Sequence, residues 1–379
     1  MMQEGFMKGF LNKILLLFFL FLSYSFAYAG PYLDSAHGNN NYGVKRNVTQ
    51  LSGYARGNCA HCHEQHAMIG GTEPQPASGS ASPFCLFAKN FSKTTANPYQ
   101  QSDDFCFYCH CYTDATSLQT SNFTNYNYSR TFGGYTSSSI DSIYEAFNQN
   151  SYHNLYDVWE FANTNTEFSW FKDDSNPCCA CHNTHLARRN KEHKGDPTYS
   201  AISKPSDHFN LWTNTMNDYA PNKYQAPYRY SGGCEPDGGS CSDLTGQAQK
   251  TPDYATFCQD CHSYNMSSYG ISQINWNADK HGNAIRSRNE HMGQPIIKPP
   301  YDVTAVSNYV LSCLDCHEPH GSYSYRYLIR KEVNAATTAF TEDSRSAWDS
   351  LCICCHQPHD NDHYLGQKCS ECHYHGSNF

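Results

Sequence analysis

The sequence has little apolar material and few cations for a chain of 379 residues. Its mean hydropathy is −0.69, which leaves thin material for a conventional hydrophobic core of this size. Beyond residue 29 no apolar stretch approaches the roughly 20 residues that a membrane-spanning helix needs. The formal net charge of −9 argues against binding to nucleic acid through phosphate contacts, which takes clustered Lys and Arg.

The one marked apolar run lies near the N-terminus, at residues 14–22. It follows a basic segment and precedes an Ala-Tyr-Ala sequence that ends at Ala29. This order is typical of a cleaved secretory signal peptide. We therefore predict a signal peptide over residues 1–29 and a single mature domain over 30–379. The protein would be exported to the extracellular space or cell surface, with the periplasm as the alternative.

Cysteine and histidine, by contrast, are abundant, with 20 residues of each. The chain carries seven copies of Cys-x-x-Cys-His, the attachment sequence of c-type haem, in which the thiols bond to the porphyrin and the histidine binds the iron. The cysteines are Cys59, Cys62, Cys106, Cys109, Cys178, Cys181, Cys258, Cys261, Cys313, Cys316, Cys352, Cys355, Cys369 and Cys372. The histidines are His63, His110, His182, His262, His317, His356 and His373. Zinc sites and redox thiols also use Cys-x-x-Cys, but neither explains a histidine after every second cysteine.

Seven covalent haems would reduce the amount of apolar side chain that the fold needs for its core. Each is a large, flat, apolar body tied to three residues, and together they would act as the core, as metals do in other core-poor chains. We predict a haem-cored fold that is mostly coil, with short helices, one at the start of each motif, and little β-strand. Ile140, Ile143 and Phe147 recur at helical spacing and predict a helix at about 138–149. Without haem the chain is expected to be unfolded.

The supply of second axial ligands can also be read from composition. Seven histidines belong to motifs, which leaves 13, whereas only four methionines lie beyond residue 29. The chain therefore has enough histidines for two per iron, but too few methionines for widespread His/Met ligation. Two histidine ligands imply haems of low reduction potential. Because both axial positions of each iron would be occupied, these haems would pass electrons without binding a substrate.

Four motifs extend to Cys-His-x-x-His. Because residues i and i+3 project from the same side of a helix, the second histidine is expected to reach a neighbouring haem rather than its own. We therefore predict four distal ligands: His66, His185, His320 and His359. For the other sites we predict His37, His153 and His281, with His208, His291, His363 and His375 as competitors. His61 and His193 are expected to be solvated or to support a ligand.

Six cysteines lie outside the attachment positions: Cys85, Cys111, Cys179, Cys234, Cys241 and Cys354. Cys234 and Cys241 flank a loop rich in Gly, Pro and Asp, which predicts a short disulfide in an oxidising compartment. Cys85 and Cys111 form a weaker candidate pair. For the two cysteines inside motifs the sequence leaves open whether they disturb haem attachment or form a disulfide.

Segments 57–66, 313–320, 352–359 and 369–375 give the chain its resemblance to a family. It resembles the extracellular multihaem c-type cytochromes of metal-respiring bacteria, some of which polymerise into cytochrome nanowires. The resemblance implies an electron-transfer protein with no catalytic residues and a continuous chain of slipped-parallel and T-shaped haems. Its partners would be copies of itself in a head-to-tail filament, other multihaem cytochromes and a terminal acceptor such as a metal oxide. In such assemblies a distal histidine often comes from the next subunit, and His37 is the candidate here.

Two alternatives remain. The same haems would also serve a discrete periplasmic or surface electron shuttle. A reductase of a small oxyanion such as nitrite or sulfite needs one iron with an open position beside catalytic side chains. All seven motifs end in histidine, and no Cys-x-x-Cys-Lys variant is present, so the reductase is the weaker of the two.

Overall fold

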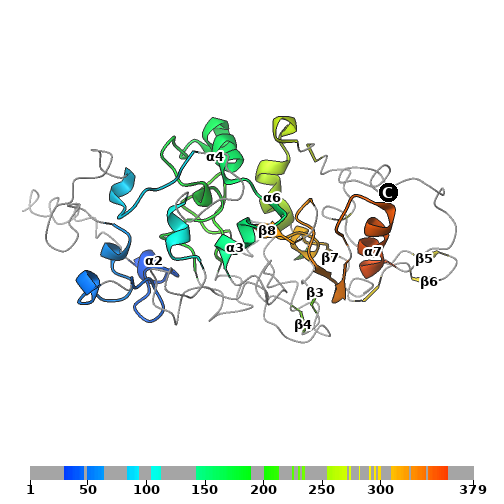
Figure 1. Cartoon of the computed structure of the whole chain (residues 1–379), viewed down its shortest axis with the longest axis horizontal. Helices are drawn as coiled ribbons and strands as arrows, with labels where there is room; N and C mark the ends of the chain where they lie inside the picture. Colours follow the sequence, from blue (N-terminus) through cyan, green and yellow to red (C-terminus); the bar gives the residue numbers. More distant parts are fainter. Residues whose placement is uncertain are drawn as a thin grey trace, which may run out of the picture.

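The computed structural model describes the following residues: 30–46, 49–63, 83–93, 104–111, 142–188, 200–212, 224–225, 229–230, 233–234, 254–270, 273–274, 281, 290–291, 294–295, 298–299, 309–323, 326–338 and 340–356. The predicted signal peptide lies outside them. The described segments follow one another along a long axis, from α2 (Gly30–Leu33) near one end to α7 (Arg345–Cys355) near the other (Figure 1).

Helices are few and short. The remaining α-helices are α3 (Ile143–Phe147), α4 (Leu155–Thr164) and α6 (Tyr254–His262). The 3-10 helices are η1 (Thr49–Leu51), η2 (Cys59–His61), η3 (Pro83–Cys85), η5 (Phe105–Tyr108), η7 (Thr166–Phe168), η8 (Pro177–Ala180), η9 (Ser267–Tyr269) and η11 (Cys313–Asp315). Among the described residues no helix is both long and apolar enough to cross a membrane.

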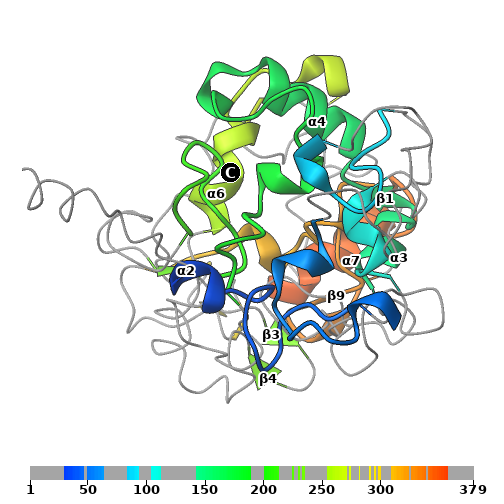
Figure 2. The same cartoon turned by 90° about the vertical axis from the view of Figure 1, so that its left-hand side faces the viewer.

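The strands are two residues long and pair only in twos. The antiparallel pairs are β1 (Ser151–Tyr152) with β8 (Gly321–Ser322), β3 (Arg229–Tyr230) with β4 (Gly233–Cys234), β5 (Glu290–His291) with β6 (Gln294–Pro295), and β9 (Glu332–Val333) with β10 (Ala336–Thr337). The parallel pair is β2 (Tyr224–Gln225) with β7 (Tyr309–Val310). Seen along the long axis, these elements form no sheet layers or helix bundle (Figure 2). The prediction of mostly coil with short helices and little strand is confirmed.

The motifs themselves form short helices by side-chain capping. Asn58, Asp104, Asn176 and Ser312 each precede the first cysteine and accept a hydrogen bond from the backbone N–H two residues on, which satisfies a donor that the first turn leaves free. Four motifs therefore begin a 3-10 helix, as predicted. The motifs at 258–262 and 352–356 instead end α6 and α7, so for these two the predicted position of the helix is wrong.

The helix predicted at about 138–149 is shorter than its pattern. Helix α3 begins after Ser142, whose hydroxyl accepts from the Glu145 backbone N–H, and ends before Asn148. The predicted Ile140 lies outside the described residues. Ile143 and Phe147 are buried against Phe107 of the second motif, so the helical spacing did identify the buried face.

The apolar interior is divided into small clusters that each include a motif residue. One contains Ala180 of the third motif, another Phe107 of the second, and a third Leu314 of the fifth. A fourth contains Cys354 of the sixth. The described apolar residues thus pack in small groups around the motifs, as expected for a chain with too little apolar material for one large core.

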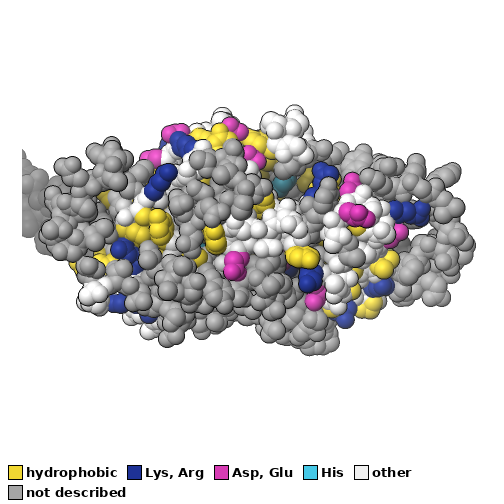
Figure 3. Space-filling model, viewed as in Figure 1, with side chains coloured by type: hydrophobic (Ala, Val, Ile, Leu, Met, Phe, Trp, Pro, Cys, Tyr) yellow, Lys and Arg dark blue, Asp and Glu magenta, His cyan; other side chains and the backbone are white. Residues whose placement is uncertain are grey.

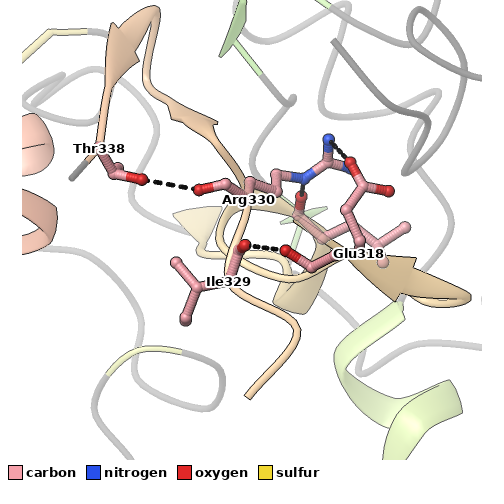
Figure 4. Close-up of polar contacts among 6 residues, drawn as sticks. Glu318, Ile329, Arg330 and Thr338 are labelled. Atoms are coloured by element: carbon pink, nitrogen blue, oxygen red, sulfur yellow. Dashed lines mark hydrogen bonds and ion pairs between the residues drawn. The ribbon is translucent and has the colours of Figure 1, made fainter. Parts of the chain in front are cut away.

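A buried ion pair holds the segment 326–330 against the fifth motif (Figure 4). The Arg330 guanidinium and the Glu318 carboxylate are 2.6 Å apart, with side chains 1% and 4% exposed. Arg330 Nε also donates to the Leu314 carbonyl at 2.6 Å, and the Thr338 hydroxyl donates to the Arg330 carbonyl at 2.8 Å. The pair therefore joins the segment 326–330 to the motif itself.

Glu318→Gln should lower stability strongly, because it leaves the Arg330 charge buried without a counter-charge. Removing one partner of such a pair costs about 3–5 kcal/mol. The urea midpoint of the haem-loaded variant should fall well below that of the wild type, whereas Glu318→Gln combined with Arg330→Met should lose less. Equal midpoints for the wild type and the single variant would show that the pair contributes nothing.

Candidate haem sites formed by paired histidines

Five motif histidines each face a second histidine ring. The ring centroids are 6.1 Å apart for His63 and His185, 6.0 Å for His110 and His37, 6.1 Å for His182 and His320, 6.2 Å for His262 and His153, and 6.3 Å for His356 and His281. In every pair one ring belongs to a motif and the other to a histidine predicted as a distal ligand. The structure therefore brings five of the predicted distal histidines next to motif histidines, in pairings that the sequence left open.

The spacing fits one metal ion between two imidazoles. A metal–imidazole bond of about 2.0 Å, plus about 1.1 Å from the nitrogen to the ring centroid, places two rings on opposite sides of one ion about 6.2 Å apart. Ring stacking does not explain the pairs, because the interplanar angles range from 13° for His63 and His185 to 90° for His37 and His110. The residues present thus fit a haem iron with two histidine ligands.

The Cys-His-x-x-His histidines reach across to another motif. His185 follows the third motif and faces His63 of the first. His320 follows the fifth motif and faces His182 of the third. Neither faces the histidine of its own motif, which agrees with the helical-spacing argument.

His37 was predicted to bind a haem of the next subunit, and in this structure of a single chain that stays a prediction. Its ring faces His110 of its own chain. Its Nδ1–H donates to the Thr184 carbonyl at 2.9 Å, and the Ala36 N–H donates to the Ala187 carbonyl at 2.7 Å. These bonds hold the N-terminal segment on the loop that follows the third motif.

The competing histidines differ from the paired ones. His208 stacks on Trp170 at 3.9 Å between centroids. His61 is buried rather than solvated, and both of its ring nitrogens are used, since Nδ1 accepts from the Arg46 N–H and Nε2–H donates to the Ala55 carbonyl. The predicted site residues His66, His359, Cys369, Cys372 and His373 lie outside the described residues, as do the competitors His363 and His375, the side chain of the competitor His291, and His193.

Backbone carbonyls fix which ring nitrogen is free. The Nδ1–H groups of His63, His182 and His317 donate to the carbonyls of Phe84, Ala201 and Tyr327 at 2.8, 2.8 and 2.6 Å. His153 Nδ1 does the same to Pro319. Since a carbonyl only accepts, Nδ1 carries the proton and Nε2 keeps its lone pair. This is the arrangement that orients metal-binding histidines and raises their basicity.

Two of these carbonyls come from strained backbone. Phe84 and Cys85 have φ of 60° and 53°, and Tyr327 and Leu328 have φ of 63° and 57°, in a region that residues other than Gly rarely adopt. The residue after each pair forms a β-bridge with the motif histidine, Leu86 with His63 and Ile329 with His317. The first and fifth motifs therefore share one local design. We call the segments 84–86 and 327–329 straps. Sequence reasoning missed this shared design, because the two straps lie at different distances along the chain from their motifs.

Burial favours the neutral form of six of the paired histidines. It lowers the pKa of His110 and of His320 to about 3 each, and it also lowers the pKa of His37, His153, His182 and His185. Among the described residues that Figure 3 shows, little histidine is visible, whereas Lys, Arg, Asp and Glu are interspersed. A neutral imidazole is the form that binds a metal.

Consecutive motifs are packed against each other in chain order. Phe87, next to the first motif, contacts Phe105 and Tyr108 at the second. Ala180 of the third motif shares a cluster with Cys261 of the fourth. The corresponding contacts join Tyr254 of α6 to Leu314 of the fifth motif, and Cys316 of the fifth to Cys355 of the sixth. The six described motifs thus contact one another in chain order.

The second and third motifs are joined by a buried polar network. The Asp104 carboxylate accepts from the Cys106 backbone N–H at 2.8 Å and from Asn176 Nδ2 at 3.2 Å. Asn176 Nδ2 also donates to the Asn90 carbonyl at 3.1 Å. The Sγ atoms of Cys106 and Cys178 and an Asp104 carboxylate oxygen lie within 4.8 Å of one another. The two attachment sites are therefore fixed relative to each other by their own helix caps.

The remaining cysteines correct one prediction. Cys85 and Cys111 both carry free thiols, so the weaker disulfide prediction is wrong; Cys85 lies in the strained strap, and the Cys111 thiol donates to the Tyr108 carbonyl. Cys179 and Cys354 are also free. Cys234 is in a disulfide, whose partner lies outside the described residues, as does the predicted Cys241.

Comparison with protein-family models, with curated proteins and with solved structures finds no match for this chain.

Asp104→Leu should destabilise the contact between the second and third motifs, since it leaves the Cys106 N–H without its side-chain acceptor and removes one of the acceptors of the Asn176 amide. An unsatisfied buried donor costs about 1–3 kcal/mol. Asp104→Asn keeps a capping oxygen and should lose less. Hydrogen exchange of the amides at 104–110 and 176–182 would report the difference. Equal protection in Asp104→Leu and in wild type would mean that the network does not hold the two motifs together.

Proposed function

We propose that this chain is an exported seven-haem c-type cytochrome that transfers electrons over a long distance. The observation that carries the proposal is the set of five histidine pairs at 6.0–6.3 Å, each with one motif member. Haem bound at the motifs would supply one-electron redox chemistry at each site. Coil and small clusters around the motifs support a fold whose core is completed by haem.

The chain's own residues would hold and insulate the sites. The motif cysteines would attach the haem, and each pair of imidazoles would hold its iron. The carbonyls of Phe84, Ala201 and Tyr327 set ring orientation and ligand basicity. An iron held by two imidazoles would have no place for a substrate, which favours electron transfer over a reductase.

The contacts between consecutive described motifs support a conduit rather than a cluster of independent sites. We propose that copies join head to tail into an extracellular filament, with other multihaem cytochromes and a terminal acceptor such as a metal oxide as partners. A discrete periplasmic or surface shuttle is the second candidate. One observation favours it: the ring that His37 faces belongs to the same chain, so this pair is complete without a second copy. Electron microscopy of the haem-loaded protein separates the two, since filaments support the first and single particles the second.

His185→Ala should open one axial position, because His185 is the ring that faces His63. The reduced, haem-loaded variant should bind about one CO per chain, with a new high-spin signal in the oxidised state, while the wild type binds none. His208→Ala is the matched control, since His208 stacks on Trp170 and its loss should leave the spectrum unchanged.

The haemochrome spectrum of the same samples gives the haem content. Seven haems per chain are expected in both variants, because neither change touches a motif. A His185→Ala protein that stays fully low-spin would exclude His185 as a ligand. A wild-type protein that carries no covalent haem would refute the proposed function itself.

A further inference from the structure

Segment 200–212 is a hairpin that covers the third motif. Its Ser203 N–H donates to the Cys181 carbonyl at 2.9 Å, and the Ala201 carbonyl accepts from His182 Nδ1. Ser203 pairs with Leu211 across the hairpin. On the other side, Trp212 packs with Tyr254 of α6 and with Leu314 of the fifth motif. The hairpin therefore lies between the third, fourth and fifth motifs.

This hairpin holds an unusual share of buried polar atoms that lack a partner. Five such side-chain atoms occur in the described part of the chain, and three of them, Ser203 Oγ, His208 Nδ1 and Trp212 Nε1, are on this hairpin. Ser203 is 0% exposed and Trp212 is 5% exposed. Buried donors are nearly always bonded, and each exception needs a specific explanation.

The other described tryptophans differ from Trp212, because each indole N–H has an acceptor. The indole N–H of Trp159 donates to the Asp173 carbonyl, that of Trp170 to the Pro205 carbonyl, and that of Trp348 to the Asp343 carboxylate. Trp212 is more deeply buried than Trp159, at 5% against 9% exposed, yet its N–H has no protein acceptor. A donor in this position is what a bound group with strong acceptor atoms would use.

We propose that Trp212 Nε1–H and Ser203 Oγ–H donate to carboxylate oxygens of haem held at the neighbouring motifs. This inference rests on the proposed function, because the propionates of haem supply the carboxylates. A carboxylate is a strong acceptor for such donors, and it would satisfy atoms that the polypeptide leaves unpaired. The hairpin would then bind the haem edge as well as orient His182.

A high-resolution map of the haem-loaded wild-type protein tests the contact directly. A haem carboxylate oxygen is expected about 2.9 Å from Trp212 Nε1. A water or a protein oxygen in that position would overturn the proposal. Because covalent haem is visible in the same map, a failure of this contact is distinguishable from a failure of the proposed function.

Trp212→Phe removes the N–H and keeps an aromatic ring. Loss of a donor to the ionised carboxylate should raise the pKa of that group, so the pH at which one haem's midpoint potential changes should move up by about one unit. Trp159→Phe is the matched control, since its N–H has the Asp173 carbonyl as acceptor, and it should show no such shift. An unchanged potential–pH curve in Trp212→Phe would also contradict the proposal.

Discussion

Two imidazole rings held about 6 Å apart are the constraint on which the rest of this structure depends. Each of the five pairs joins segments that are distant in sequence, such as His63 with His185 and His182 with His320. A chain with a mean hydropathy of −0.69 has little else to hold such segments together. The pairs therefore serve as cross-links whose strength comes from the group they would bind, because metal-binding free energy is also folding free energy.

The local backbone is arranged to serve these rings. Strained residues at Phe84 and Tyr327 place a carbonyl on the Nδ1–H of a motif histidine, and the buried Arg330–Glu318 pair fixes one of these straps. Strain of this kind persists only where surrounding contacts determine the conformation. The strain lowers the stability of the fold and fixes the orientation of the rings, which a site for electron transfer would need more than a uniform core.

Much of the candidate site could be predicted from the sequence. The spacing of the two cysteines and the histidine in Cys-x-x-Cys-His indicates haem attachment, and i, i+3 geometry indicated that His185 and His320 reach another motif. Coil content followed from low hydropathy. The partner of each ring, the order of motifs in space and the straps depend on long-range packing that no local pattern encodes. His37 shows the limit most clearly, since no local pattern indicated that its ring would face His110 or that its segment would bond to Thr184 and Ala187.

Near-infrared magnetic circular dichroism of the oxidised, haem-loaded protein tests the central claim most directly, because its charge-transfer bands distinguish pairs of axial ligands. The account predicts low-spin haem with two histidine ligands as the dominant signal. Substantial high-spin haem, or bands of His/Met ligation at the sites assigned to histidine pairs, would contradict it.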